Sequence, residues 1–447
     1  MTSYIVKGNI IHTPSIHQFE VVENGYMYIE NGKCQWIKNE LSEEVIKELN
    51  ISISKIDEID DLSKTLIYDF KDMIIIPSFI DLHVHAPQYI QMGIGLDLSL
   101  IDWLYQYTFR IEERFADINY AKKCYPAFVQ GLYDSGTLRS VVYGTIHKES
   151  NEILVDELNK KGLCALVGKV NMNRFAPINL METVEKSVQD TYDFIEDIKI
   201  KNYKYIKPIV TPRFAPSCSS DLLQKLGDLS NELSLPIQSH LCETQREIDW
   251  VKDLFKEELT KEKGTYSDVY KNHSLYGNQP TVMAHGIFME PREIELALEH
   301  NVFIAHCPTS NMNITSGIMP LAKYIDLGLN IGLGSDVGAG HTLAMNQVII
   351  SAVQNSKLRH VLYGDRKLVE AEAFYLATKG NGKFFEQVFK GEKIGSFEEG
   401  SSFDALVIKD DHPLMDSLTP IEQLQRFLYC GNESSIKMRF LNGDIIR

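Results

Sequence analysis

The chain has 447 residues, a formal net charge of −16 at pH 7 and 44% hydrophobic residues. This hydrophobic share is typical of globular proteins and excludes wholesale disorder, whereas the acidic balance argues against a nucleic-acid partner. Residues 1–15 lack the basic start and apolar core of a secretory signal, and no apolar run approaches the roughly 18 residues of a membrane span. Seven cysteines without any C-x-x-C pair indicate reduced thiols rather than disulfides or a zinc ribbon. We therefore expect a cytoplasmic protein without a membrane segment.

The N-terminal part predicts short strands joined by turns. Residues 26–30 and 33–37 are rich in β-formers, and the Asn31-Gly32 dipeptide between them is a strong hairpin signal. Further strand-like runs lie at 4–11 and 74–77.

The C-terminal part has the same character. Residues 403–408 and 436–440 predict strands, and Asn442-Gly443 predicts a second hairpin. Two β-rich ends around a different middle predict one small β-sandwich domain, formed by both chain termini from residues 1–76 and 391–447.

The middle of the chain, residues 77–390, alternates short apolar runs with segments of helical period such as 222–233 and 292–300. Eight such strand–helix units predict an α/β fold of the (β/α)₈ TIM-barrel type. A doubly wound open sheet is the alternative, but no G-x-G-x-x-G follows the first strand. The eight apolar runs are 79–85, 138–146, 165–172, 205–211, 236–240, 281–285, 302–307 and 330–336.

The first of these runs ends in three polar residues. The two-residue period of a strand places Asp81, His83 and His85 on one face. Inner strands of a parallel barrel are nearly all apolar, so these buried polar groups need a partner, which a metal ion would provide. A lone H-x-H remains a weak signal, because such histidines are often hydrogen-bonded core residues.

Four other runs also end in a polar residue, namely His240, His285, His306 and Asp336. Active groups of a barrel gather at the carboxyl ends of its strands, so the joint pattern is stronger than any single member. Imidazole and carboxylate ligands suit Zn²⁺ or Fe²⁺, with one position open to water. For His306, a role as a satisfied core residue competes with this interpretation.

Glu243 lies three residues beyond His240, where a carboxylate can lean over a metal without binding it. A general acid and base needs that placement. The alternative is an acidic residue at the start of the helix expected at 245–252.

Other metal and nucleophile motifs are excluded. His147-Lys148-Glu149 matches H-x-E of the cytidine-deaminase type, but P-C-x-x-C is absent downstream. There is no H-E-x-x-H and no G-x-S-x-G. The fourth run ends without a lysine that could bridge two metals, so we expect a single metal ion.

These motifs resemble those of the amidohydrolase superfamily over nearly the whole chain. The A-P-Q-Y and T-P-R-F segments are particular to the branch of the superfamily that deaminates guanine. The matching segments are 77–89, 207–214, 238–243, 283–286, 305–311 and 332–336.

The resemblance implies hydrolytic deamination of guanine to xanthine and ammonia by a homodimer. It also implies one Zn²⁺ per chain, or Fe²⁺, with Glu243 shuttling protons, Asp336 accepting the proton of water, and His285 contacting the water or the substrate. The implied metal ligands are His83, His85, His240 and Asp336.

The resemblance places Gln88, Arg213 and Phe214 against the substrate, together with His240, Glu243 and His285. Arg213 only donates hydrogen bonds, so it suits the O6 and N7 acceptors of guanine better than the amino group of adenine. Without the resemblance, the preferred interpretations are a surface arginine for Arg213, a loop amide for Gln88 and a core aromatic residue for Phe214.

Two other functions stay open. The same metal site would serve deamination of another aminopurine, a pterin or a triazine. A barrel that has lost activity could act as a scaffold, but such proteins usually lose ligands, and here all of the expected ligands are present.

Overall fold

The computed structural model describes residues 3–49, 66–262, 264–412 and 418–447. Among these residues, no helix combines the length and the apolar character that crossing a membrane requires. The chain divides into two units. Unit 1 comprises Met1–Ile80, Asp134–Leu138 and Val369–Arg447, and unit 2 comprises Asp81–Tyr133 and Arg139–Leu368.

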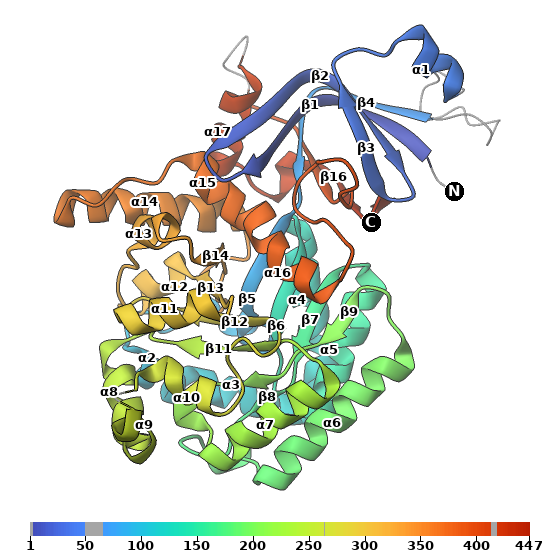
Figure 1. The fold of residues 1–447 in the computed structure, drawn as a ribbon. Helices are drawn as coiled ribbons and strands as arrows, with labels where there is room; N and C mark the ends of the chain where they lie inside the picture. Colours follow the sequence, from blue (N-terminus) through green and yellow to red (C-terminus); the bar gives the residue numbers. More distant parts are fainter. Residues whose placement is uncertain (1–2, 50–65, 263, 413–417) are drawn as a thin grey trace. The chain divides into compact units, whose positions relative to one another are not determined.

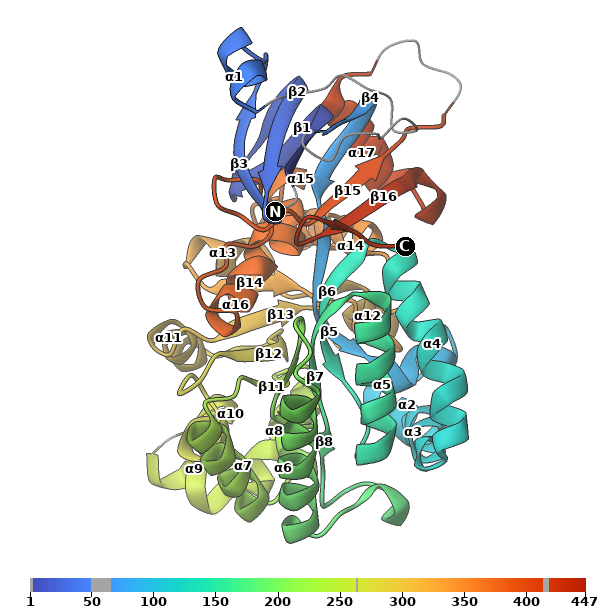
Figure 2. The ribbon, with the colours of Figure 1, turned by 90° about the vertical axis from the view of Figure 1, so that its right-hand side faces the viewer.

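Strands from both ends of the chain form one seven-stranded sheet in unit 1, in the order β17-β16-β15-β4-β1-β2-β3. Strands β1 and β4 are parallel, and the other neighbours are antiparallel. Figure 2 shows β15 beside β4, where Val407 pairs with Ile75. The strands are β1 Ser3–Ser15, β2 Gln18–Glu30, β3 Lys33–Lys38, β4 Leu66–Pro77, β15 Ala405–Ile408, β16 Ile436–Leu441 and β17 Asp444–Ile445.

Both predicted hairpins are confirmed. Asn31 and Gly32 have φ of 53° and 77° and join β2 to β3. Asn442 and Gly443 have φ of 49° and 82° and join β16 to β17. Two successive residues with positive φ give the turn twist that a tight hairpin needs, and Asn-Gly adopts them at low cost.

The sheet of unit 1 turns back toward its own edge. The Cys34 N–H of edge strand β3 donates to the Ser401 carbonyl at 2.9 Å, and Lys33 forms a bridge with Ser402, just before β15. Apolar side chains from both halves of the sheet then share one buried cluster, which includes Val6, Ile10, Met27, Ile75, Val407 and Phe440. The helices of this unit are α1 Glu43–Glu48, α15 Glu370–Tyr375, α16 Asn381–Val388 and α17 Pro420–Cys430. Of these, α15 and α16 fall within the segment 77–390 that was predicted as barrel.

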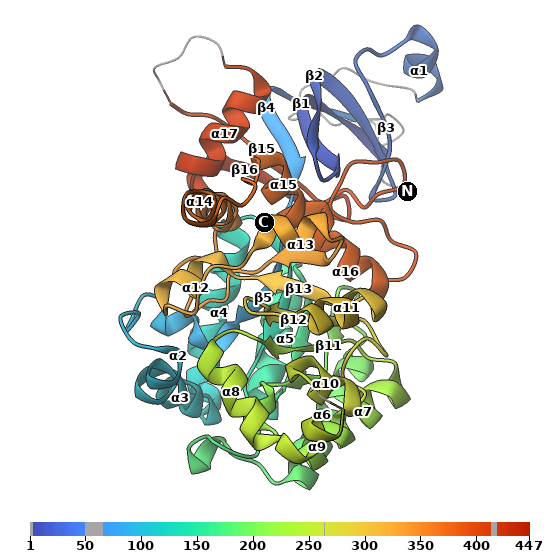
Figure 3. The same ribbon diagram turned by 60° about the vertical axis from the view of Figure 1, so that its left-hand side comes forward.

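Eight parallel strands of the middle segment form two four-stranded sheets, β5-β6-β7-β9 and β11-β12-β13-β14. Each of the eight predicted apolar runs overlaps one of them, and Figure 3 shows β11, β12 and β13 side by side. The strands are β5 Phe79–His85, β6 Thr137–Tyr143, β7 Cys164–Gly168, β9 Ile206–Pro208, β11 Ile237–Leu241, β12 Thr281–His285, β13 Phe303–His306 and β14 Asn330–Leu333.

Backbone hydrogen bonds link these two sheets at both ends. A bridge between Val210 and Ile237 connects the chain after β9 to β11. On the other side, the Asp336 N–H donates to the His83 carbonyl at 2.8 Å, and the His85 N–H donates to the Val337 carbonyl at 3.0 Å. The fourth run, predicted as one strand over 205–211, is instead β9, which ends at Pro208, followed by a short β10, Thr211–Pro212, which extends one residue past the run. Pro208 and Pro212 lack the N–H of a regular ladder.

Helices separate most of these parallel strands. The predicted helix 222–233 is α7, which begins after Ser219, whose side chain accepts from the Leu222 N–H. Figure 1 shows the helices of this unit around its strands. The helices are α2 Leu100–Trp103, α3 Phe109–Glu113, α4 Ile118–Asp134, α5 Lys148–Lys161, α6 Val184–Lys201, α7 Ser220–Leu233, α8 Gln245–Leu254, α9 Lys256–Glu262, α10 Tyr266–Asn272, α11 Pro291–Glu299, α12 Pro308–Asn313, α13 Leu321–Asp326 and α14 Met345–Tyr363.

Candidate active site

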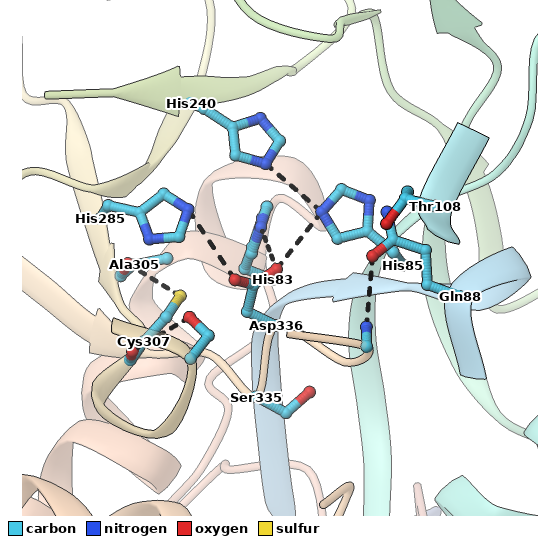
Figure 4. Close-up of polar contacts among 12 residues, drawn as sticks. His83, His85, Gln88, Thr108, His240, His285, Ala305, Cys307, Ser335 and Asp336 are labelled. Carbon is cyan, nitrogen blue, oxygen red and sulfur yellow. Dashed lines mark hydrogen bonds and ion pairs between the residues drawn. The ribbon is translucent and has the colours of Figure 1, made fainter. Parts of the chain in front are cut away.

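Side chains at the carboxyl ends of the parallel strands converge on one point of unit 2, as Figure 4 shows. They come from β5, β11 and β12 and from the segment that follows β14, so four separate parts of the chain contribute. Parallel strands present their carboxyl ends at the same edge, which explains the convergence. The converging residues are His83, His85, His240, His285 and Asp336.

The distances in this group are those of a metal-ligand cluster. One ligand atom each from His83, His240, His285 and Asp336 lies within 4.8 Å of the others. His85 lies beside them, with its Nε2 3.3 Å from His240 Nε2 and 3.4 Å from Asp336 Oδ1. This group differs in one member from the ligands predicted from the sequence, because it contains His285 in place of His85. The side chains of both histidines face the same point as the other three (Figure 4).

The hydrogen bonds of the histidines fit a bound cation. His83 Nε2 is buried without a hydrogen-bond partner and lies 3.1 Å from Asp336 Oδ1. His240 Nδ1 lies 2.6 Å from the Arg213 carbonyl, which accepts its proton and leaves Nε2 with a free lone pair. Imidazole nitrogens and a carboxylate form a donor set suited to Zn²⁺ or Fe²⁺. The residues present therefore fit a divalent metal ion.

Burial and mutual charge shift the pKa values of the cluster in opposite directions. Burial lowers the pKa of His83 to about 4, and burial with the neighbouring histidines holds the pKa of His240 well below its usual value. Burial would raise the pKa of Asp336, but the facing histidines keep it well below its ordinary range. His83 and His240 are therefore neutral and Asp336 is ionised, which are the protonation states of metal ligands. Burial would lower the pKa of His285, but the carboxylates of Glu243 and Asp336 raise it.

Asp81 shares the predicted face with the histidines but has a different role. Its Oδ1 accepts from the backbone N–H groups of His83 and Ser335, both at 3.0 Å. The buried carboxylate thus ties β5 to the segment after β14 that carries Asp336. Burial raises the pKa of Asp81 to about 7.

His306 also lies at a strand end, but outside the cluster. Its carbonyl accepts from the Gly334 N–H at 2.9 Å, and its Nδ1 is buried without a hydrogen-bond partner. Burial lowers the pKa of His306 to about 3. His306 is thus a buried residue outside the cluster, but its ring is not fully satisfied as the core interpretation expected.

Glu243 faces the cluster from the loop after β11. Its Oε2 lies 3.5 Å from His285 Nε2, and its Oε1 accepts from Ser316 Oγ at 2.9 Å. The helix start that competed for Glu243 is instead capped by Thr244 and Glu247, which form a capping box on α8. The Glu243 carboxylate is therefore free to face the cavity, where burial raises its pKa to about 7.

A cavity adjoins this cluster. Apolar side chains from α2 and the adjoining turn, including Trp103, form part of its wall. Phe214 lies near Trp250, with ring centroids 6.1 Å apart. The predicted site residues that line the cavity are His85, Gln88, Arg213, Phe214, His240, Glu243, His285 and Asp336.

Three buried residues that support the site were missed by the sequence reasoning. Glu112 accepts from Gln88 and Arg213, Asn311 Oδ1 lies 2.9 Å from His285 Nδ1, and Ser316 donates to Glu243. None of them ends a predicted strand. Asn311 lies within the segment 305–311, which follows the strand end at His306 and carries part of the family resemblance. Its place in this segment is the one signal that could have found it.

Comparisons with known proteins agree with this geometry. The Amidohydrolase family matches residues 74–446. Guanine deaminase of Dictyostelium discoideum is 35% identical over 99% of this chain and 98% of its own. Guanine deaminase of Rattus norvegicus is 34% identical over 98% and 95%. The crystal structure of guanine deaminase from C. acetobutylicum with bound guanine in the active site is 42% identical, covers 100% of both chains and has a TM-score of 0.90.

The strand-end cluster, the adjoining cavity and a family match over most of the sequence define one class of protein. The chain belongs to the amidohydrolase family. The three relatives described above, from amoeba, rat and bacterium, are guanine deaminases.

Proposed function

We propose that this protein is an enzyme that catalyses the hydrolytic deamination of guanine, releasing xanthine and ammonia. The observation that carries the proposal is one cavity that joins a histidine–aspartate cluster, the Glu243 carboxylate and the Arg213 guanidinium. The 42% identity to an enzyme whose structure holds guanine in its active site supports this choice of base.

His83, His85, His240 and Asp336 would hold the metal, with Zn²⁺ preferred over Fe²⁺. His285, whose ligand atom lies within 4.8 Å of those of His83, His240 and Asp336, would contact either the metal or the reacting water. A divalent ion at this point supplies Lewis-acid activation, which makes water nucleophilic near neutral pH.

The proton transfers fall to Glu243 and Asp336. Water forms a bond to C2 of the ring, the C2–N bond to the amino group breaks, and the departing NH2 group needs one proton to leave as ammonia. Asp336, held ionised by the histidines, can accept the first proton of water. Glu243 has a pKa raised to about 7, so its Oε2 can protonate the ring nitrogen beside C2. The resulting carboxylate can then take the proton of the hydroxyl added at C2 and pass it to the amine, and the proton held by Asp336 restores Glu243.

Recognition of the base would fall to three residues. Arg213 offers only donors and is 4% exposed, so it suits the adjacent O6 and N7 acceptors that lie opposite C2. Gln88 can both donate and accept along the remaining edge, and the Phe214 ring can pack against the plane of the base.

The remaining expectations extend this proposal to the whole chain. The eight parallel strands, linked at both ends, would close into a (β/α)₈ barrel over residues 77–390. The sheet that turns back on itself would form the two layers of a β-sandwich from 1–76 and 391–447. We also propose that the protein is a homodimer and that it lies in the cytoplasm. Sedimentation equilibrium would test the first statement and cell fractionation the second.

The direct test follows xanthine and ammonia after guanine is added to enzyme with one metal per chain. Turnover is expected, and none at full metal content would refute the proposal. Glu243→Gln should keep the metal but lose about 10²- to 10⁴-fold in kcat. Glu295→Gln, an exposed carboxylate on α11, is the matched control and should leave kcat unchanged. If another aminopurine, a pterin or a triazine has a larger kcat/KM than guanine, that compound is the substrate instead.

A further inference from the structure

One buried carboxylate joins the two side chains that face the base. Glu112 on α3 is 2% exposed. Its Oε1 accepts from Gln88 Nε2 at 2.9 Å, and its Oε2 accepts from Arg213 Nη1 at 2.5 Å. Gln88 follows β5 and Arg213 follows β10, so the carboxylate ties together two strand ends from distant parts of the chain.

This contact fixes which way the Gln88 amide points. An ionised carboxylate only accepts, so Gln88 must turn its Nε2 toward Glu112. On the other side, the Gly338 N–H donates to Gln88 Oε1 at 3.3 Å. A donor and an acceptor in the surroundings thus specify the same orientation, and one N–H and one lone pair of the amide remain for a ligand.

The same contact fixes the guanidinium. Arg213 lies with its charged group 5.4 Å from the centre of the Phe109 ring, and Phe109 belongs to the same helix as Glu112. The carboxylate accepts from one donor of the guanidinium, Nη1, and compensates its charge, which burial would otherwise make costly. Donors on the other sides remain available toward the cavity that Arg213 lines.

We propose that Glu112 is a positioning residue for base selectivity, which aligns the Gln88 amide and the Arg213 guanidinium for a purine with acceptors at O6 and N7. It is absent from the residues that line the cavity, so it acts through these two partners rather than on the base. This inference rests on the proposed function, because it concerns how the same cavity chooses guanine.

Glu112→Gln tests the inference with little change in volume. An amide has one acceptor and one donor end, so it cannot accept from both Gln88 Nε2 and Arg213 Nη1. Either the Gln88 amide turns over or the guanidinium loses its partner. We expect KM for guanine to rise about 10- to 100-fold with kcat within about threefold, the range for loss of a hydrogen bond to a charged group.

The decisive measurement compares guanine with 2-aminopurine, which keeps the reacting amino group but lacks O6. Glu112→Gln should lower the ratio of their kcat/KM values at least fivefold and weaken xanthine binding by a similar factor in calorimetry. An unchanged ratio, whether both substrates are retained or lost equally, would overturn the positioning role. Absence of guanine turnover by the unsubstituted enzyme would instead refute the proposed function.

Two further variants complete the experiment. Glu113→Gln, on the next residue of α3, makes the same change of charge where the carboxylate contacts Asn179, and it should leave the ratio unaltered. If Glu112→Gln does not fold, Glu112→Asp keeps both acceptors on a shorter side chain. It should lower the ratio about threefold, and no change in the ratio would overturn the inference.

Discussion

His240 Nδ1 lies 2.6 Å from the backbone carbonyl of Arg213. The backbone of Arg213 therefore orients an imidazole of the candidate metal centre, while its side chain lines the cavity and contacts Glu112. The Arg213 N–H in turn donates to the Asn171 carbonyl at 3.1 Å, which holds this segment in place. A change of the side chain alone should thus leave the metal centre intact.

Arg213→Lys should separate base recognition from metal binding. Lysine keeps the charge but lacks the planar fork that can meet two adjacent acceptors. We expect kcat/KM for guanine to fall about 10- to 100-fold, with unchanged metal content by elemental analysis. Arg246→Lys, at an exposed position of α8, is the control and should leave both quantities as they are. Loss of metal from Arg213→Lys would contradict the division of roles between its backbone and side chain.

Removing an imidazole from the cluster should release the metal. His240→Asn takes away Nε2, which faces His85 Nε2 at 3.3 Å, and should lower metal content well below one ion per chain. His306→Asn changes a histidine outside the cluster and should keep full metal content. The result that would reverse this assignment is retention of metal by His240→Asn together with its loss from a folded His306→Asn.

Gly334→Ala should disturb the metal centre through contact alone. A Cβ at this position would lie 2.7 Å from the Cβ of His83 and 3.2 Å from Cys307 Sγ, so β5 would have to move. We expect metal affinity, measured against a competing chelator, to drop about 10- to 100-fold. Gly328→Ala has no atom within 4 Å and φ of +84°, so it should cost about 1 kcal/mol in stability and leave metal affinity unchanged. Equal metal affinities in the two variants would contradict the expectation.

His12 should make the folded state sensitive to acid. The buried imidazole accepts from the Phe397 N–H at 3.2 Å through Nδ1, and burial lowers its pKa to about 4. Between pH 6.5 and 4 the unfolded chain binds a proton there that the folded chain does not. The free energy of unfolding therefore decreases as pH falls through this window, by at most about 3 kcal/mol, and this contribution is constant below it.

The measurement is urea unfolding at several pH values between 4 and 7. His12→Asn keeps an acceptor for the Phe397 N–H but does not titrate, so its stability should depend less on pH in this window. His17→Asn removes a histidine whose side chain is 72% exposed and should follow the unsubstituted protein. Parallel pH profiles for all three proteins would exclude His12 as the responsible group.

The sequence predicted the parts of the fold that depend on local pattern. The bounds of β5 and β12 agree with the predicted runs 79–85 and 281–285, because apolar residues with a polar end are a signal carried by the strand itself. The Asn-Gly hairpins were predictable for the same reason, since the turn type follows from two residues. Strand-end histidines could be collected without a structure because parallel strands share one edge.

What the sequence left unpredicted depends on contacts between distant segments. Glu112 lies in a helix between the first two parallel strands, and nothing in its neighbours shows that it will meet Gln88 and Arg213. Asp81 lies in the same strand as the histidines, yet its carboxylate turns to backbone N–H groups rather than to the cluster. The fourth run is divided into β9, which ends at Pro208, and β10, and its apolar pattern alone does not show this division.

The pairing of β4 with β15 bears on how the chain is made. The ribosome releases β1 to β4 early, but β15 begins only at Ala405, so one edge of β4 waits unpaired while the whole middle segment is synthesised. An unpaired strand edge can template pairing with another chain. A nascent chain that stalls before Ala405 would therefore expose an aggregation-prone edge that the finished protein conceals.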